Sequence, residues 1–192
     1  ENKAILGFNI DVLPNAEREL EQAEVRLFSD DVIYQLVEEY DEYVEEMKRS
    51  QQETILDKII RPARFQILQD HTFRQSDPAV VGVEIMSGTV KNNTNVAKFE
   101  NNEPDRVGQL SGIQLQGEDV SEARAGQRVS IAIDGPTVGR QIEEGDELWV
   151  DLPEKHAKIL EQELSDEIPA DELEALSGYL NKRRKRDPFW GK

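Results

Sequence analysis

DPAVVGVEIMSGTVKNNTNVAKFE, residues 77–100, holds short apolar runs that end at turn residues such as Lys91-Asn-Asn. The runs are rich in valine, isoleucine and threonine, and such runs bounded by Gly and Asn predict β-strands. Similar runs lie on both sides of this stretch. The predicted strands are Phe65–Leu68, Val80–Ile85, Gly88–Val90, Val96–Phe99, Val107–Leu110, Ile113–Leu115, Val129–Ile133 and Glu147–Val150. Many short strands at this spacing predict a small antiparallel β-barrel.

The segment before the barrel has the apolar spacing of a long helix. No Gly or Pro interrupts it between Asp31 and Pro62. A helix from Asp31 to about Ile60 would be roughly 45 Å long at ~1.5 Å per residue. Its second half, KRSQQETILDK, is mostly polar, which is typical of a helix that bridges two bodies through solvent.

The N-terminal residues predict a β-α-β unit. Ala4–Val12 is nearly continuously apolar, as in a buried parallel strand, a short helix follows over Ala16–Ala23, and Val25–Phe28 is a second strand. Two parallel strands cannot bury both faces of a sheet. Because the chain also begins at Glu1 without a methionine, we expect that this α/β domain is truncated and that its earlier strands are missing.

The last forty residues predict two helices. The first runs from Pro153 to about Leu164, and Pro169 opens a second that runs towards Arg186. We therefore predict an α+β multidomain fold: a partial α/β piece, a long connector helix, a small antiparallel β-barrel and two C-terminal helices. The predicted boundaries are 1–30, 31–60, 61–152 and 153–192.

The composition is strongly acidic, with 40 Asp and Glu against 23 Lys and Arg and a formal charge of −17. This balance argues against a nucleic-acid binder, because phosphate contacts need clustered Lys and Arg. Alternatively, it indicates a protein that works in molar salt. At about 1 M salt the Debye length is only ~3 Å, so acidity no longer prevents contact with RNA. The chain has no cysteine and no run of 18 apolar residues, so we expect a cytoplasmic protein with no disulfide and no membrane span.

Enzymatic chemistry is not indicated. The sequence has no Gly-rich loop that ends in Gly-Lys-Ser/Thr, and His71 and His156 are far apart with no cysteine beside them. Paired carboxylates for acid–base work could come from Glu143, Glu144 and Asp146. These residues, however, lie in the predicted turn EEGDE, where solvated acidic residues are the norm. We predict a binding module with no catalytic, cofactor-binding or metal-binding residues.

Three further stretches carry a family resemblance. VGQLSGIQLQGEDVSEARAGQRVSIAIDG (107–135) and GRQIEEGDELWV (139–150) resemble the β-barrel of translational GTPases. AILGFNIDVLPNAERELEQAEVRLFSDDVIYQLVEEYDEYVEEMK (4–48) resembles the second half of the third domain of the universal translation initiation factor. That family is called initiation factor two in archaea and five-B in eukaryotes. The acidity and the ending DPFWGK indicate a haloarchaeal source.

The resemblance implies a function for the complete factor. Such a factor binds GTP with Mg through an N-terminal domain, promotes binding of initiator methionyl-tRNA and joins the ribosomal subunits. This chain lacks the GTP-binding motifs, so it would supply a lever, a barrel that contacts the tRNA end, and partner-docking helices. A stand-alone RNA- or protein-binding adaptor built from the same parts is the alternative, and a glycosidase-like enzyme is a more distant one.

Candidate tRNA-contacting residues lie in the predicted loop HTFRQSDP (71–78) and at Gly139-Arg140. Phe73 could stack on a base, and Arg74 or Arg140 could meet a phosphate. The alternatives are that Phe73 packs on the end of the barrel and that the two arginines are ordinary exposed cations.

The chain ends in NKRRKRDPFWGK (181–192), a basic run followed by two aromatic residues. The helix macrodipole favours some cations at a helix C-terminus, but five in succession exceed that need. In the eukaryotic members of the family that the chain resembles, the final helices dock the C-terminal tail of initiation factor one-A, an acidic segment with apolar anchors. The docking candidates are Leu176, Leu180, Lys182, Arg183, Arg184, Lys185, Arg186 and Trp190. Alternatively, Phe189 and Trp190 fold back on the helices or barrel while the basic run contacts ribosomal RNA.

Overall fold

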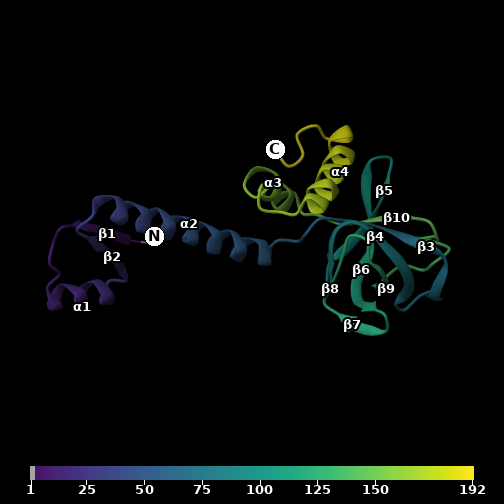
Figure 1. The fold of residues 1–192 in the computed structure, drawn as a ribbon. Helices are drawn as coiled ribbons and strands as arrows, with labels where there is room; N and C mark the ends of the chain where they lie inside the picture. Colours follow the sequence, from purple (N-terminus) through teal and green to yellow (C-terminus); the bar gives the residue numbers. More distant parts are fainter. Residues whose placement is uncertain (1–2) are drawn as a thin grey trace. The chain divides into compact units, whose positions relative to one another are not determined.

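A computed structural model describes residues 3–192. The chain divides into two compact units, residues 1–57 and residues 58–192. Figure 1 shows the elements of each unit in sequence colours.

The first unit contains the predicted β-α-β arrangement. Its elements are β1 (Lys3–Phe8), α1 (Pro14–Gln22), β2 (Val25–Asp30) and α2 (Ile33–Lys58). The two strands are parallel. Phe28 and Leu36 are buried, and the ring of Phe28 packs against Tyr40 and Tyr43. Other apolar side chains of β1, such as Leu6 and Phe8, remain about half exposed.

The long helix is slightly shorter than predicted. The 26 residues of α2 span about 39 Å at ~1.5 Å per residue. Its start is preceded by a side-chain turn in which Asp30 Oδ1 accepts from the Val32 amide at 2.7 Å. Its end falls at Lys58 because Ile59 and Ile60 take part in the second unit instead, where Ile59 is buried.

The second unit is built on the predicted antiparallel barrel. Its strands are β3 (Ala63–Arg74), β4 (Ala79–Lys91), β5 (Asn95–Glu100), β6 (Glu103–Leu115), β7 (Glu118–Val120), β8 (Glu122–Arg124), β9 (Arg128–Asp134) and β10 (Glu147–Val150). The order β3-β10-β5-β6-β9-β4 is closed by pairing of β4 with β3, while β7 and β8 pair with β6 and β4. The core includes the fully buried Phe65, Ile67, Val81, Val83, Ile85, Leu110, Ile113, Ile131, Ile133 and Leu148.

Three predicted boundaries within the barrel were wrong. Residues 80–85 and 88–90 are parts of one strand, β4, and residues 107–110 and 113–115 are parts of β6. In both strands the register shifts by a residue, at Met86 and at Ser111, and such bulges reverse which residues face inward. The predicted loop 71–78 begins inside β3, which continues to Arg74.

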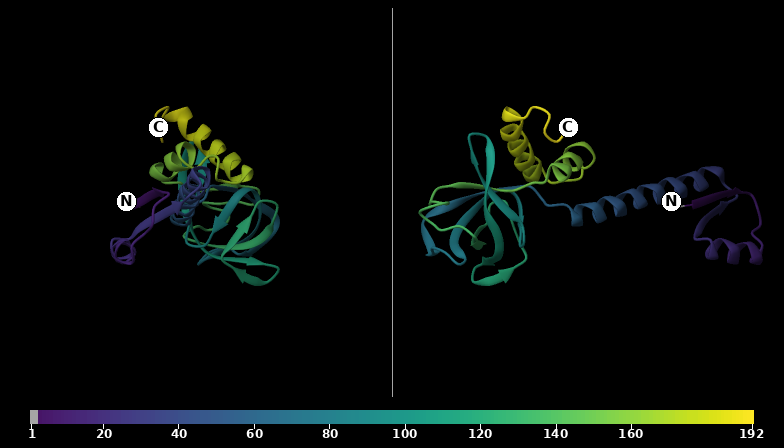
Figure 2. Two further views of the ribbon diagram at one scale, coloured as in Figure 1. Left: turned by 60° about the vertical axis from the view of Figure 1, so that its left-hand side comes forward. Right: turned by 180° about the vertical axis from the view of Figure 1, so that it is seen from behind.

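The two C-terminal helices form as predicted, α3 over Glu154–Gln162 and α4 over Ala170–Arg186. They lie side by side at one end of the barrel, as the views in Figures 1 and 2 agree. Helix α4 packs closely there, because a Cβ at Gly178 would lie 2.8 Å from Cη2 of Trp149. The rings of Phe99, Trp149 and Tyr179 meet at centroid distances of 5.2 to 6.3 Å and join helix to barrel.

Within residues 3–192, none of the helices combines the length and apolar character needed to cross a bilayer.

Candidate functional site

The end of the barrel at which β3 finishes brings the three predicted tRNA-contacting residues together. The Val138 amide donates to the Gln75 carbonyl at 2.9 Å, which places the loop that carries Arg140 beside the end of β3. Phe73 is 65% exposed, and Arg74 and Arg140 are exposed as well. The structure therefore presents an aromatic ring and two guanidinium groups to solvent at one end of the barrel.

Carboxylates of the EEGDE turn hold this part of the barrel in place. Glu144 accepts hydrogen bonds from the Thr72 hydroxyl at 2.7 Å and from the Asp70 amide at 2.8 Å. These bonds favour the charged form and hold the pKa of Glu144 below its usual value. Asp146 accepts from Lys98 Nζ at 2.8 Å. The turn is therefore structural, and no group of acidic or histidine side chains in the described residues 3–192 could hold a metal ion.

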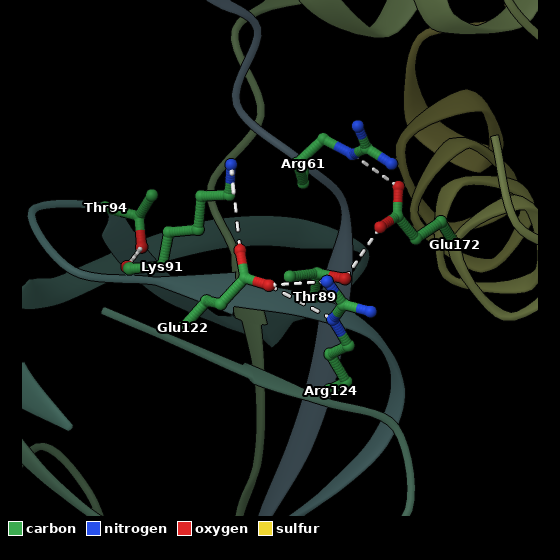
Figure 3. A network of polar contacts seen from close by, with 7 residues as sticks. All are labelled: Arg61, Thr89, Lys91, Thr94, Glu122, Arg124 and Glu172. Atoms are coloured by element: carbon green, nitrogen blue, oxygen red, sulfur yellow. Dashed lines mark hydrogen bonds and ion pairs between the residues drawn. The ribbon is translucent and has the colours of Figure 1, made fainter. Parts of the chain in front are cut away.

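The opposite end of β3 carries a buried charge (Figure 3). The carboxylate of Glu172, on α4, is 2% exposed. It accepts from Arg61 Nε at 2.6 Å and from the Thr89 hydroxyl at 2.7 Å. Because Arg61 precedes β3 and Thr89 lies on β4, this single side chain links α4 to two segments of the barrel.

The residues between α2 and β3 are fixed by several further contacts. The Ile60 amide donates to Nδ1 of His156 at 3.2 Å, and the Thr89 amide donates to the Pro62 carbonyl at 3.3 Å. Burial lowers the pKa of His156, which favours the neutral ring that can accept this hydrogen bond. Residues 59–62 are thus held by both C-terminal helices and by the barrel.

Most side chains of the basic run, residues 182–186, contact other residues of the same chain. Arg184 forms a two-pronged pair with Glu161 at 2.7 and 2.6 Å, and Arg186 pairs with Glu103. The Lys182 ammonium lies over the rings of Phe99 and Trp149, and the Arg183 guanidinium lies over the ring of Trp190. Lys185 is exposed. The five cations therefore do not form a uniform surface patch.

The apolar docking candidates lie inside the packing. Leu176, Leu180 and Trp190 are 1%, 3% and 6% exposed, whereas Phe189 is 78% exposed. These three side chains are not exposed in this arrangement, because the chain folds back after α4 and places the indole against Tyr179; their part in docking a partner stays a prediction. For Trp190 the folded-back alternative describes the structure, and for Phe189 it does not.

Comparison with known proteins finds relatives of both units. The model of the family described as Elongation factor Tu domain 4 matches residues 61–149, and that of Translation-initiation factor 2 matches residues 1–41. A probable translation initiation factor IF-2 from Haloquadratum walsbyi is 74% identical over 191 residues, covering 100% of this chain and 31% of that protein. Its counterpart from Halorubrum lacusprofundi is 73% identical, covering 100% and 32%. The chain belongs to the translation initiation factor IF-2 family.

A solved structure supports this assignment across both units. The crystal structure of GDP-bound aIF5B from Aeropyrum pernix is similar with a TM-score of 0.67 and 34% identity, covering 98% of this chain and 31% of that one. The family resemblance, the fold class and the haloarchaeal relatives inferred from the sequence are confirmed. The chain spans about a third of the length of the IF-2 relatives it matches, in which it corresponds to a C-terminal part.

Several residues that organise this part of an IF-2 protein gave no signal in the sequence. Glu172 is one acidic residue among forty, and its partners lie 83 and 111 positions away. Tyr179 is another example: its hydroxyl donates to Asp151 Oδ1 at 3.0 Å and accepts from the Leu152 amide at 3.3 Å. In the sequence, Pro169 and the apolar spacing of Leu173, Leu176 and Leu180 predicted this helix but not its docking on the barrel.

Proposed function

We propose that this chain is the working C-terminal part of a ribosome-dependent initiation factor in the cytoplasm. In this proposal the complete factor hydrolyses GTP, promotes binding of initiator methionyl-tRNA and joins the ribosomal subunits. The exposed barrel end contacts the tRNA acceptor end, the C-terminal helices dock initiation factor one-A, and α2 acts as a lever. The observation that carries the proposal is the grouping of Phe73, Arg74 and Arg140 by the Val138–Gln75 hydrogen bond.

The chemistry of that barrel end suits a single-stranded RNA end. An exposed aromatic ring can stack on any base, and guanidinium groups bind phosphate oxygens with charge-assisted hydrogen bonds. Arg74 donates to the Asp77 carbonyl at 3.4 Å, and its side chain remains exposed. Glu144 accepts hydrogen bonds from Thr72 and Asp70, and Asp146 pairs with Lys98, so these two carboxylates are engaged with groups other than the two arginines.

The C-terminal helices offer a smaller surface for initiation factor one-A than the sequence predicted. Lys185 and Phe189 are exposed, and Arg186 lies at the surface with Glu103 as its partner. An anionic segment of a partner could compete with Glu103 for Arg186, because exposed ion pairs contribute little and are screened in salt.

GTP and Mg belong, in this proposal, to the part of the factor that this chain does not contain. The sequence has no Gly-Lys-Ser/Thr phosphate loop, and the described residues contain no cluster of acidic side chains that fits a metal ion. No step of the proposed function of this chain therefore passes through the nucleotide.

The test is binding of initiator methionyl-tRNA to the whole chain over a series of KCl concentrations. We expect Arg74→Gln with Arg140→Gln to reduce the slope of log K against log [KCl] by about 1.4, the value for two phosphate contacts on a single strand. We expect Phe73→Ala to weaken binding by about tenfold, within the range measured for one base stacked on an aromatic ring.

Arg128→Gln is the matched control. Arg128 is 70% exposed and pairs with Glu84 at 3.0 Å, at the end of β9 away from Arg74. If the paired substitution at Arg74 and Arg140 changes the slope no more than Arg128→Gln does, the barrel end is not the tRNA contact.

A further inference from the structure

The connector helix ends earlier than its sequence requires. Helix α2 stops at Lys58, although no glycine or proline follows until Pro62. Proline disfavours the helical conformation at the residue before it, here Arg61, so the helix could continue through Ile60. Its observed end is therefore set by contacts that residues 59–62 make with other parts of the chain.

The amide of Ile60 has two possible hydrogen-bond acceptors. In an α-helix an amide donates to the carbonyl four residues earlier, which for Ile60 belongs to Leu56. In the structure this amide donates instead to Nδ1 of His156, on α3, at 3.2 Å. Because a single N–H group makes one well-aligned hydrogen bond, the two arrangements exclude each other. The imidazole therefore competes with the helix for the same donor.

The two residues that follow Ile60 are anchored independently of this competition. Arg61 Nε donates to the buried carboxylate of Glu172 at 2.6 Å, as Figure 3 shows. The Pro62 carbonyl accepts from the Thr89 amide, on β4, at 3.3 Å. Both residues therefore belong to the second unit whichever acceptor the Ile60 amide uses, and a change at this joint is confined to the residues just before them.

The protonation state of His156 decides whether its ring can accept. A neutral imidazole has one acceptor nitrogen, whereas the protonated ring has two donors and no acceptor. Burial, followed by the charge of Lys155 beside it on α3, lowers the pKa of His156, which favours the neutral ring. Of the other elements at this joint, the connector contributes the charge of Arg61 and α4 that of Glu172, and these two groups pair at 2.6 Å. A proton on the ring removes the acceptor and leaves the Ile60 amide to the helix.

We propose that His156 is a positioning residue that sets the end of the connector helix. While its ring accepts from the Ile60 amide, α2 ends at Lys58 and Ile59 stays buried, at 7% exposure. When the ring is protonated or α3 moves away, the helix continues through Ile60 and lengthens by two residues, or about 3 Å at ~1.5 Å per residue. The position of α3 is thereby coupled to the length of the connector. This inference concerns the joint alone and does not depend on the tRNA contact or on a docked partner.

The test is nuclear magnetic resonance of the isotope-labelled full chain. A scalar coupling across the hydrogen bond, between the amide nitrogen of Ile60 and Nδ1 of His156, is expected at about pH 8. It should be lost towards about pH 5, since this range spans the protonation of histidine. The Cα shifts of Ile59 and Ile60 should move to helical values over the same interval. Their midpoint should coincide with that of the His156 ring and lie below the ordinary histidine pKa.

Three variants separate positioning from simple packing. His156→Phe keeps a ring but removes the acceptor, so helical shifts of Ile59 and Ile60 are expected already at about pH 8. His156→Asn offers an amide oxygen near the place of Nδ1 that does not titrate, so α2 should end at Lys58 throughout the pH range. His71→Phe is the matched control, because His71 is the other histidine of the chain and is exposed. Residues 59–60 of this control should titrate as in the wild-type chain.

Absence of the coupling at about pH 8 overturns the proposal, because His156 then does not hold the Ile60 amide. Cα shifts of residues 59–60 that do not follow protonation of the ring, or that titrate in His156→Asn as in the wild-type chain, overturn it as well. If His156→Phe does not fold, as judged by circular dichroism, the wild-type titration and the flat profile expected of His156→Asn decide instead.

Discussion

Replacing Arg61 by methionine removes the charged partner of Glu172 while keeping a side chain of similar length. The carboxylate is 2% exposed and the Arg61 side chain 16% exposed, so neither group is well reached by water. After the substitution the carboxylate retains only the hydroxyl of Thr89 among its present side-chain partners. Breaking a buried pair in this way costs about 3–5 kcal/mol of unfolding free energy, because an uncompensated charge stays buried.

Urea unfolding followed by tryptophan fluorescence measures this cost. Trp149 and Trp190 are the two tryptophans of the chain and both lie in the second unit, so their signal reports that unit alone. With a urea dependence of about 2 kcal/mol per molar, the midpoint is expected to fall by about 1.5–2.5 M. Arg128→Met is the control, since its exposed pair with Glu84 contributes only about 0–1 kcal/mol.

Salt separates the two kinds of ion pair. In about 1 M KCl the Debye length is ~3 Å, so the effect of Arg128→Met should vanish while that of Arg61→Met persists. Adding Glu172→Leu to Arg61→Met should recover most of the lost stability, because a hydrophobic replacement of both charges leaves no buried charge unpaired. A midpoint change for Arg61→Met no larger than that of Arg128→Met, or one that disappears in salt, would refute this reasoning.

Two further predictions concern the same junction. Gly88→Ala should destabilise the second unit by at least about 1 kcal/mol more than Gly126→Ala in urea unfolding. Both glycines have a φ of +82°. A Cβ at Gly88, however, would lie 2.0 Å from the Pro62 carbonyl oxygen, whereas Gly126 has open space around it. The pKa of His156 is lowered in the folded chain, so its contribution to the free energy of unfolding is complete above the ordinary histidine pKa and is lost as pH falls through the folded value. The stability of the chain should therefore decrease on acidification below about pH 6.5. The decrease should be smaller in His156→Gln. Identical pH profiles for the two chains, or equal costs for the two glycine substitutions, would contradict these arguments.

The apolar pattern was sufficient to predict the barrel but not the continuity of its strands. In β4 the inward residues Val81, Val83 and Ile85 alternate until Met86, where the bulge shifts the phase. A reader of the sequence sees alternation stop and infers a turn. The same shift at Ser111 divided β6, so a strand that bends around a barrel resembles two short strands in its sequence.

Local sequence also could not separate the two aromatic residues of the C-terminal segment. Phe189 and Trp190 are adjacent and both apolar, and which one is buried depends on the turn at Asp187 and on the position of Tyr179. By contrast, the grouping of the barrel-end candidates follows from strand order, which places residues 73–74 and the loop after β9 at the same end. Sequence reasoning located those residues but had no means to detect the Val138–Gln75 bond.

The charges of the second unit divide into two classes, and this division bears on how an acidic protein can bind partners in molar salt. The exposed pair of Arg186 with Glu103 is screened, so it costs little to exchange Glu103 for the anion of a partner. The pair of Arg61 with Glu172 is buried, so it keeps its strength in salt and maintains the geometry of the junction. High salt is therefore expected to weaken the exposed pair of Arg186 with Glu103 and to spare the buried pair of Arg61 with Glu172.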